Sequence, residues 1–120
     1  MEKQNKFGIR VGDIFHSQYG WNTVRHAFYK VVAINGTTQV TVKELKTKVV
    51  SDDGYGQQGN LMMVDEFEDN PYYNKELKKT VQKYRFSNDD EYFIKIGNYE
   101  NAYLMKPEEY NNTYWFDYMD

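Results

Sequence analysis

The sequence contains no cysteine, so it can form no disulfide bond, thiolate metal site or cysteine nucleophile. No segment comes near the roughly 20 consecutive apolar residues that a membrane-spanning helix needs. The opening residues, MEKQNKFGIRVGD, have no apolar run after their charges, so no secretory signal is expected. These absences predict a cytoplasmic protein without a membrane partner.

Motifs of the common enzyme classes are also missing. The sequence has no glycine-rich phosphate loop, no nucleophile elbow around a serine and no helical His-Glu zinc motif. Asp52, Asp53 and Gly54 lack the alternating oxygen ligands and the closing glutamate of a calcium loop. The sequence therefore predicts a protein that is not an enzyme and that uses no metal or cofactor.

Aromatic residues, in contrast, are abundant. They make up 18% of the 120 residues, and 12 of them are tyrosines. A chain of this length is expected to form one β-rich domain, 1–120, whose small core cannot bury every ring. Tyrosine combines an apolar ring with a polar hydroxyl, so the excess is expected either at core edges or at a binding surface.

Charge is divided unevenly along the chain. The net charge is −3, but residues 1–50 hold eight Lys or Arg against three acidic residues, and residues 51–120 hold seven against fifteen. The two halves therefore have opposite signs. This division predicts either separate faces for separate partners or ordinary surface charge.

The strongest structural pattern is a β-hairpin in the first half. HAFYKVVAI, which begins at His26, is rich in aromatic and β-branched residues and is followed by TTQVTVKEL. Asn35-Gly36 between them predicts a two-residue type I′ turn, because that turn needs positive φ angles. Further β patterns occur in LMMV, EYFIKI, AYLM and TYWFDY.

Two segments interrupt these patterns. SDDGYGQQGN, residues 51–60, has three glycines and no periodicity, which predicts a mobile loop. In residues 71–84, aromatic and aliphatic residues recur at helical spacing after Asn70-Pro71, so a helix is favoured over a strand there. The fold prediction is mainly β: a small antiparallel barrel, SH3-like, or a compact sandwich, with at most one helix near residues 71–84. The final strand is expected to close it by pairing with an early one.

The only two histidines, His16 and His26, face each other if the first hairpin turns around Trp21. Cross-strand Cβ atoms lie about 5 Å apart, which is close enough to share a metal ion. A catalytic zinc normally takes three protein ligands, and no third one is indicated by spacing. We therefore interpret the pair as two ordinary, half-exposed histidines.

One candidate surface is the tip of the first hairpin. Small β-barrels bind single-stranded nucleic acids by stacking bases on exposed aromatic rings beside basic residues. The side chains available for such a platform are Tyr19, Trp21, Arg25, Tyr29 and Lys30. The acidic second half would repel the same phosphate backbone, which makes nucleic acid the alternative partner rather than the favoured one.

The other candidate is an acidic, aromatic surface in the second half, suited to the basic face of another protein. Its predicted core consists of Asp89, Asp90, Glu91, Tyr99, Glu108, Glu109 and Tyr110. Further tyrosines in this half include Tyr72, Tyr73, Tyr92, Tyr103 and Tyr118. The same carboxylates could act as an acid–base pair, but solvated turns are the simpler interpretation. The tyrosines could equally cap a small core.

The first hairpin resembles a motif of short, uncharacterised proteins from bacteriophages and mobile elements. The matching residues are Gly12, Asp13, Ile14, Phe15, Ser17, Tyr19, Gly20, Trp21, Phe28, Tyr29, Val31 and Val32. The likeness continues at Val64, Asp65, Phe67, Ala102, Tyr103, Leu104 and Tyr110. The resemblance implies a small accessory protein acting in the cytoplasm of a bacterial host.

These observations lead to three functional hypotheses. The first is a non-enzymatic accessory protein that binds a bacterial host protein, such as an inhibitor of a defence nuclease of the anti-CRISPR or anti-restriction type. The second is a single-stranded nucleic-acid-binding β-barrel that uses the hairpin tip. The third is a nucleotide-sequestering protein with an aromatic pocket. The sequence leaves the oligomeric state open.

Overall fold

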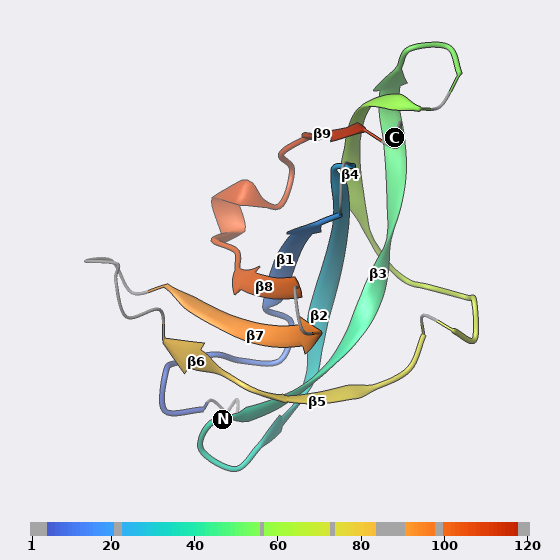
Figure 1. The fold of residues 1–120 in the computed structure, drawn as a ribbon. Coiled ribbons are helices and arrows are strands. Elements are labelled where there is room, and N and C mark those ends of the chain that lie inside the picture. The colour runs from blue at the N-terminus through green and yellow to red at the C-terminus, as the bar shows by residue number, and fades with distance from the viewer. Residues whose placement is uncertain are drawn as a thin grey trace.

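The computed structural model describes residues 5–20, 23–55, 57–72, 74–83, 91–97 and 100–117 (Figure 1). These residues form nine strands and one short 3₁₀ helix. The elements are β1 (Ile14–Tyr19), β2 (Arg25–Asn35), β3 (Gln39–Asp52), β4 (Gln58–Phe67), β5 (Leu77–Thr80), β6 (Gln82–Lys83), β7 (Tyr92–Gly97), β8 (Glu100–Leu104), η1 (Pro107–Glu109) and β9 (Tyr114–Asp117). The prediction of a mainly β, antiparallel fold is confirmed.

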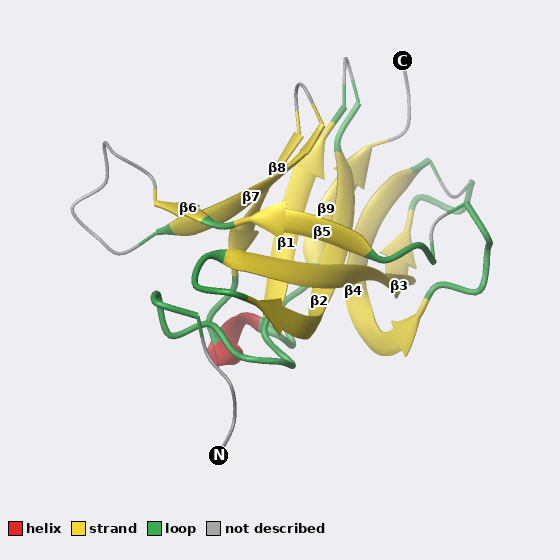
Figure 2. Ribbon diagram, turned by 90° about the horizontal axis from the view of Figure 1, so that it is seen from below, coloured by secondary structure: helices red, strands yellow, loops and turns green. Residues whose placement is uncertain are grey.

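The strands form a curled sheet in the order β6-β7-β8-β1-β2-β3-β4-β9, and β5 also pairs with β3 (Figure 2). Only Val81 separates β5 from β6, so the segment that pairs with β3 continues directly into pairing with β7. Neighbouring strands therefore form a closed circuit, which runs from β3 through β5, β6, β7, β8, β1 and β2 back to β3. Closure covers edges that would otherwise attract other strands.

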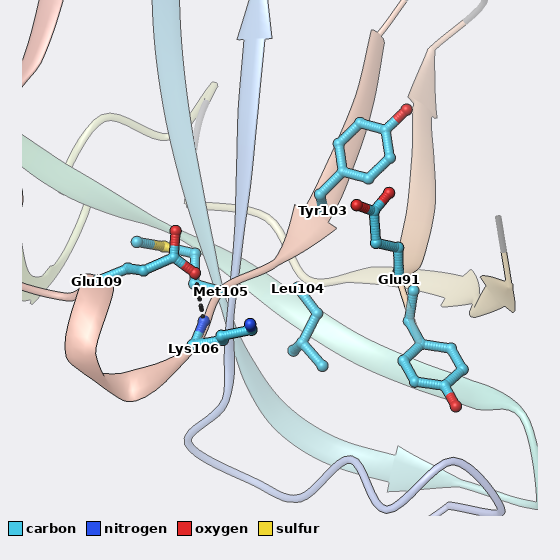
Figure 3. A pocket seen from close by; sticks show the side chains of 7 residues that line it. Glu91, Tyr103, Leu104, Met105, Lys106 and Glu109 are labelled. Atoms are coloured by element: carbon cyan, nitrogen blue, oxygen red, sulfur yellow. Dashed lines mark hydrogen bonds between the residues drawn. The ribbon is translucent and has the colours of Figure 1, made fainter. Parts of the chain in front are cut away.

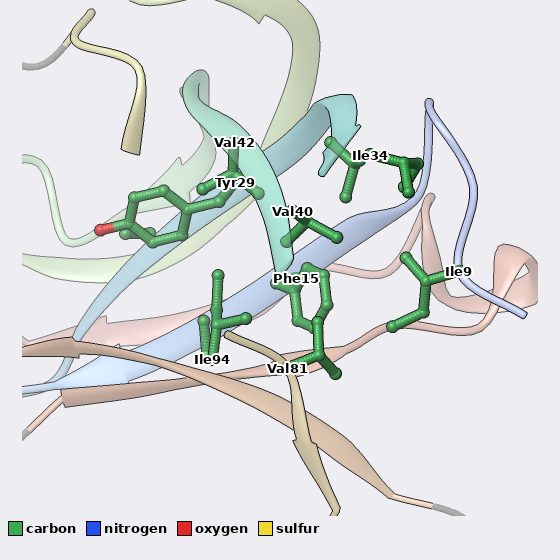
Figure 4. Packing of buried hydrophobic residues seen from close by; sticks show 11 residues of the cluster. Ile9, Phe15, Tyr29, Ile34, Val40, Val42, Val81 and Ile94 are labelled. Atoms are coloured by element: carbon green, nitrogen blue, oxygen red, sulfur yellow. The ribbon is translucent and has the colours of Figure 1, made fainter. Parts of the chain in front are cut away.

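The β1–β2 hairpin separates two hydrophobic cores, because successive side chains in a strand point to opposite faces. Phe15 and Tyr29 point into the first core, inside the curled barrel (Figure 4). That core contains Ile9, Phe15, Ala27, Tyr29, Val31, Ile34, Val40, Val42, Val81, Ile94 and Ala102. Burial of each large side chain stabilises the fold by about 1.5–3 kcal/mol.

The second core lies on the other face of the hairpin, beneath β4 and β9. It contains Ile14, Phe28, Leu45, Leu61, Met63, Met105 and Phe116. β9 covers it by pairing with β4, and Asp117 exchanges two backbone hydrogen bonds with Val24 at 2.7 and 3.0 Å. The expectation that the final strand closes the barrel on an early strand is therefore wrong: β5 and β6 close it, and β9 reaches the start of β2 through one bridge.

The turn at Asn35-Gly36 is longer than predicted. Asn35 pairs with Gln39, which leaves three residues in the turn, and Gly36 has a φ of 71°. Two carbonyl groups of this turn have partners: Thr37 accepts from the Lys6 N–H at 2.8 Å and Thr38 from the Val81 N–H at 2.9 Å. The longer turn thus ties the hairpin to the N-terminal segment and to the β5–β6 segment.

The helix predicted near residues 71–84 is wrong where the structure describes that segment, because Leu77–Thr80 and Gln82–Lys83 are strands. Tyr73 and Tyr84 lie outside the described residues. Leu77 and Val81 both pack against the first core. Residues four apart share a face in a helix and also in a strand, so this spacing suits either structure.

The loop predicted at residues 51–60 is shorter in the structure. β3 continues to Asp52 and β4 begins at Gln58. In the connection, Asp52 Oδ1 accepts the Gly54 N–H at 2.8 Å and Asp53 Oδ1 accepts the Tyr55 N–H at 2.9 Å. These carboxylates therefore serve as turn formers.

Candidate binding site

A pocket of about 710 Å³ opens beside β7, β8 and η1 (Figure 3). Its lining comes from three stretches: the residues at the start of β7, the end of β8 and the short helix that follows. The lining residues are Glu91, Tyr92, Tyr103, Leu104, Met105, Lys106 and Glu109. The pocket therefore combines carboxylates, aromatic rings and aliphatic side chains, with one ammonium group.

The strand geometry positions the pocket's floor and one wall. Tyr103 is 40% exposed, and its ring lies 5.6 Å from that of Phe93 on β7. Leu104 packs against the first core and Met105 belongs to the second, so these two lining residues lie on opposite sides of the sheet. The Met105 N–H donates to the Ile14 carbonyl at 2.8 Å, which fixes the end of β8 against β1.

The opposite wall is η1, which begins at Pro107. Proline suits a first helical position because its φ is already close to the helical value. The Lys106 N–H donates to Glu109 Oε1 at 2.9 Å, and the Glu109 N–H donates to the Lys106 carbonyl at 2.8 Å. These two hydrogen bonds hold the Glu109 carboxylate at the pocket.

The pocket assembles part of the predicted acidic, aromatic surface. Glu91 and Glu109 line it together, whereas Glu108 is exposed on the same turn but is not part of the lining. Tyr110 is half-buried and packs against the second core, as the core-cap alternative predicted. Asp89, Asp90 and Tyr99 lie outside the described residues. The lining residues that the site prediction missed are Leu104, Met105 and Lys106, together with Tyr92 and Tyr103, which the sequence marked only as surplus tyrosines.

Tyr29 and Lys30 do not belong to the predicted hairpin-tip platform. Tyr29 is only 5% exposed, and its hydroxyl donates to Glu100 Oε2 at 3.2 Å inside the barrel. Lys30 points to the opposite face, where its ammonium lies 2.6 Å from Asp65 Oδ1. Tyr19 and Arg25 are cross-strand partners, and Trp21 lies outside the described residues. Tyr29 cannot stack on a base because it is buried, and Lys30 points away from it because neighbouring residues of a strand face opposite ways.

The two histidines do lie in contact, as predicted from the hairpin. His26 pairs with Gln18, so it is diagonal to His16, and His16 Nε2 lies 2.8 Å from His26 Nδ1. His26 Nε2 lies 2.7 Å from the Trp115 carbonyl oxygen, which only accepts, so His26 Nε2 carries a hydrogen. Because the pKa of each ring is lowered, both are neutral at neutral pH, and His26 Nδ1 then accepts from His16 Nε2–H.

Burial explains why this pair stays neutral. Desolvation, followed by the charge of His26, lowers the pKa of His16 from 6.5 to about 4. Burial also lowers the pKa of His26, against the opposing effect of its hydrogen bond to the Trp115 carbonyl. Both rings are partly exposed, as expected, and their hydrogen bonds to each other and to the Trp115 carbonyl give the pair a structural role. Among the described residues, no three His, Cys, Asp or Glu side chains are placed to hold a metal ion.

A second polar cluster lies inside the barrel. The buried Ser17 hydroxyl donates to Glu100 Oε2 at 2.6 Å, beside the hydrogen bond from Tyr29. Burial, then the charges of Glu68 and Glu100, raises the pKa of Glu44 from 4.5 to about 7. Burial and the charges of Glu100 and Glu44 also raise the pKa of Tyr29, so this hydroxyl stays protonated and can donate.

Replacing Glu44 with glutamine should stabilise the protein at alkaline pH. A carboxyl group with a raised pKa contributes stability below pH 4.5 and loses it as the pH rises through about 7. Solvent screening at this partly exposed site limits the gain for Glu44→Gln to about 1 kcal/mol at pH 8. Urea unfolding at pH 5 and pH 8 tests this, and an equal effect at both values would contradict it.

No family model, curated protein or solved structure matches this chain. None of the helices in the described part of the chain has the length and apolar character needed to cross a membrane.

Proposed function

We propose that this chain is a non-enzymatic protein that binds another protein through the pocket face formed by β7, β8 and η1. The observation that supports the proposal is the convergence of Glu91 and Glu109 with the half-exposed Tyr103 around one pocket. Exposed tyrosine rings supply contact area at little entropic cost. Carboxylates beside them favour a partner whose surface is basic.

The proposed partner is a bacterial host protein, and the proposed role is inhibition of a defence nuclease by a phage or mobile-element protein. The resemblance of the first hairpin to such proteins supports the origin. Nucleases bind the phosphate backbone through basic surfaces. An acidic, aromatic face that covers such a surface would compete directly with the nucleic acid.

The pocket's charge also favours protein over the two alternatives. Both carboxylates would repel the phosphates of a nucleotide or an oligonucleotide, and one lysine offsets only one of them. The hairpin tip offers no substitute, because Tyr29 is buried and Lys30 is paired with Asp65. Protein binding is therefore the function that the described side chains support best.

The test is capture of a partner from a bacterial host lysate by the wild-type chain and by two charge-reversal variants. Glu91→Lys changes the pocket, and Glu66→Lys makes the same change at an exposed position on β4. We expect Glu91→Lys to lose the partner and Glu66→Lys to retain it. The captured protein should have a nucleic-acid-binding activity that falls when the purified chain is added. Equal capture by both variants would contradict the proposed surface.

A further inference from the structure

We infer that the pocket accepts an arginine side chain of the partner, an inference that rests on the proposed function. An arginine brings a planar cation on a three-carbon apolar stem, and the pocket offers a matching surface for each part.

The two carboxylates stand at opposite ends of the pocket lining. In Figure 3, Glu91 extends toward the ring of Tyr103, whereas Glu109 lies across Leu104 and Met105 on the side of η1. Glu109 Oε1 already accepts the Lys106 N–H. The Glu91 carboxylate beside Tyr103 is therefore the principal anchor for a cation, and Glu109 adds negative charge from the other side.

The aromatic wall favours a guanidinium over an ammonium. A guanidinium can stack on the exposed face of Tyr103 while it donates two parallel hydrogen bonds to Glu91. It is also more weakly hydrated than an ammonium, so it loses less on entering a partly apolar pocket. Met105, which lies on the same side of the sheet as Tyr103, can contact the methylene groups, as apolar surfaces do for long basic side chains.

Lys106 supplies a directional test of this inference, because it is a positive charge in the lining of the same pocket. It opposes any cation that binds there. Removing its charge should therefore tighten the binding of a cationic ligand, whereas it would weaken the binding of an anion. A purely structural role for the lining would produce neither change in a ligand-dependent way.

The experiment is an NMR titration of the full chain with three blocked tripeptides, Gly-Arg-Gly, Gly-Lys-Gly and Gly-citrulline-Gly. Citrulline has nearly the shape of arginine but no charge. We expect saturable shifts at Tyr103 and Met105 with the arginine peptide, at least about fivefold weaker binding of the lysine peptide, and none of the citrulline peptide. Equal binding of arginine and citrulline peptides, or no saturable shifts at the pocket, would overturn the inference.

Three variants complete the design. Glu91→Gln should weaken the arginine peptide by about tenfold or more, Lys106→Gln should strengthen it by about two- to threefold, and Glu108→Gln should leave it unchanged. Glu108 is the matched control, since it lies on the same turn but outside the lining. Thermal unfolding of each variant verifies that it is folded. Equal effects of Glu91→Gln and Glu108→Gln would contradict the site.

The outcome separates this inference from the function on which it rests. If the partner is captured through Glu91 but the arginine peptide does not bind, the protein-binding surface stands and the arginine pocket is wrong. If Glu91→Lys also captures the partner normally, both are wrong. If both experiments give the expected results, the partner should carry an arginine whose replacement by alanine abolishes capture.

Discussion

Phe116→Ala should lower the free energy of unfolding by about 3–5 kcal/mol, which is a large part of the stability of a domain of this size. Phe116 is 0% exposed and lies in the second core with Phe28 and Leu61. It is carried by β9, a strand of four residues. Because so short a strand has few other contacts, the cavity left by the ring should loosen β9 from β4.

The measurement is urea unfolding followed by circular dichroism, with Trp115→Ala as the control. Trp115 precedes Phe116 on the same strand but is 50% exposed, and its carbonyl oxygen, which accepts from His26, remains in the variant. We expect Trp115→Ala to cost less than about 1 kcal/mol. A larger cost for Trp115→Ala than for Phe116→Ala would mean that β9 presents its other face to the core.

The β-hairpins could be predicted because their signals are local. Strand alternation in β2 and β3 and the Asn35-Gly36 turn lie within a few residues of one another. The turn length was wrong because it depends on partners far away in the sequence, namely the N–H groups of Lys6 and Val81. Local residues thus favoured a turn, and tertiary hydrogen bonds decided which one.

The closure of the sheet lay beyond local pattern. The spacing of Leu77 and Val81 fits a helix and a strand equally well, and only the unpaired edges of β3 and β7 decide between them. A backbone segment that supplies hydrogen bonds to both edges gains more from strand pairing than from a single isolated helix. Predicting strands for this segment therefore required the strand order, and the strand order cannot be deduced from periodicity.

The candidate site shows the same division. Glu91 and Glu109 were recognised as members of an acidic, aromatic region, but their shared pocket depends on β8 bringing η1 beside the start of β7. The separation of Tyr29 from Lys30 could have been predicted, since adjacent residues of a strand face opposite ways. Their residue types suggested one shared platform, whereas strand alternation places Tyr29 and Lys30 on opposite faces of β2.

The histidine pair was predictable as a contact but not in its role. The hairpin register brings His16 near His26. The third group in this series of hydrogen bonds, the Trp115 carbonyl, lies 89 residues from His26 in the sequence. His16 also packs against Phe28 and Tyr114, with ring centroids 4.7 and 4.4 Å apart. The pair therefore links β1 and β2 to β9, which no local pattern indicated.

We expect the histidine pair to make stability fall in mild acid. The pKa of His16 is lowered from 6.5 to about 4 in the folded protein, so only the unfolded chain gains this proton between those values. The contribution is present above pH 6.5 and is lost as the pH falls toward 4. The difference in pKa sets an upper limit of about 3 kcal/mol, which partial exposure reduces to about 1–2 kcal/mol.

His16→Phe isolates this effect, because it keeps a ring against Phe28 and Tyr114 but cannot titrate. Urea unfolding from pH 4 to pH 7.5 should show a flatter profile for the variant than for the wild type. Glu44 has the opposite dependence, since its raised pKa makes the fold more stable as the pH falls from about 7. The effect of Glu44 is the same in the wild type and in His16→Phe, so it cancels when their free energies of unfolding are subtracted. Parallel profiles would show that His16 takes up its proton equally in the folded and unfolded states, and the assignment of a neutral, partly buried pair would then be wrong.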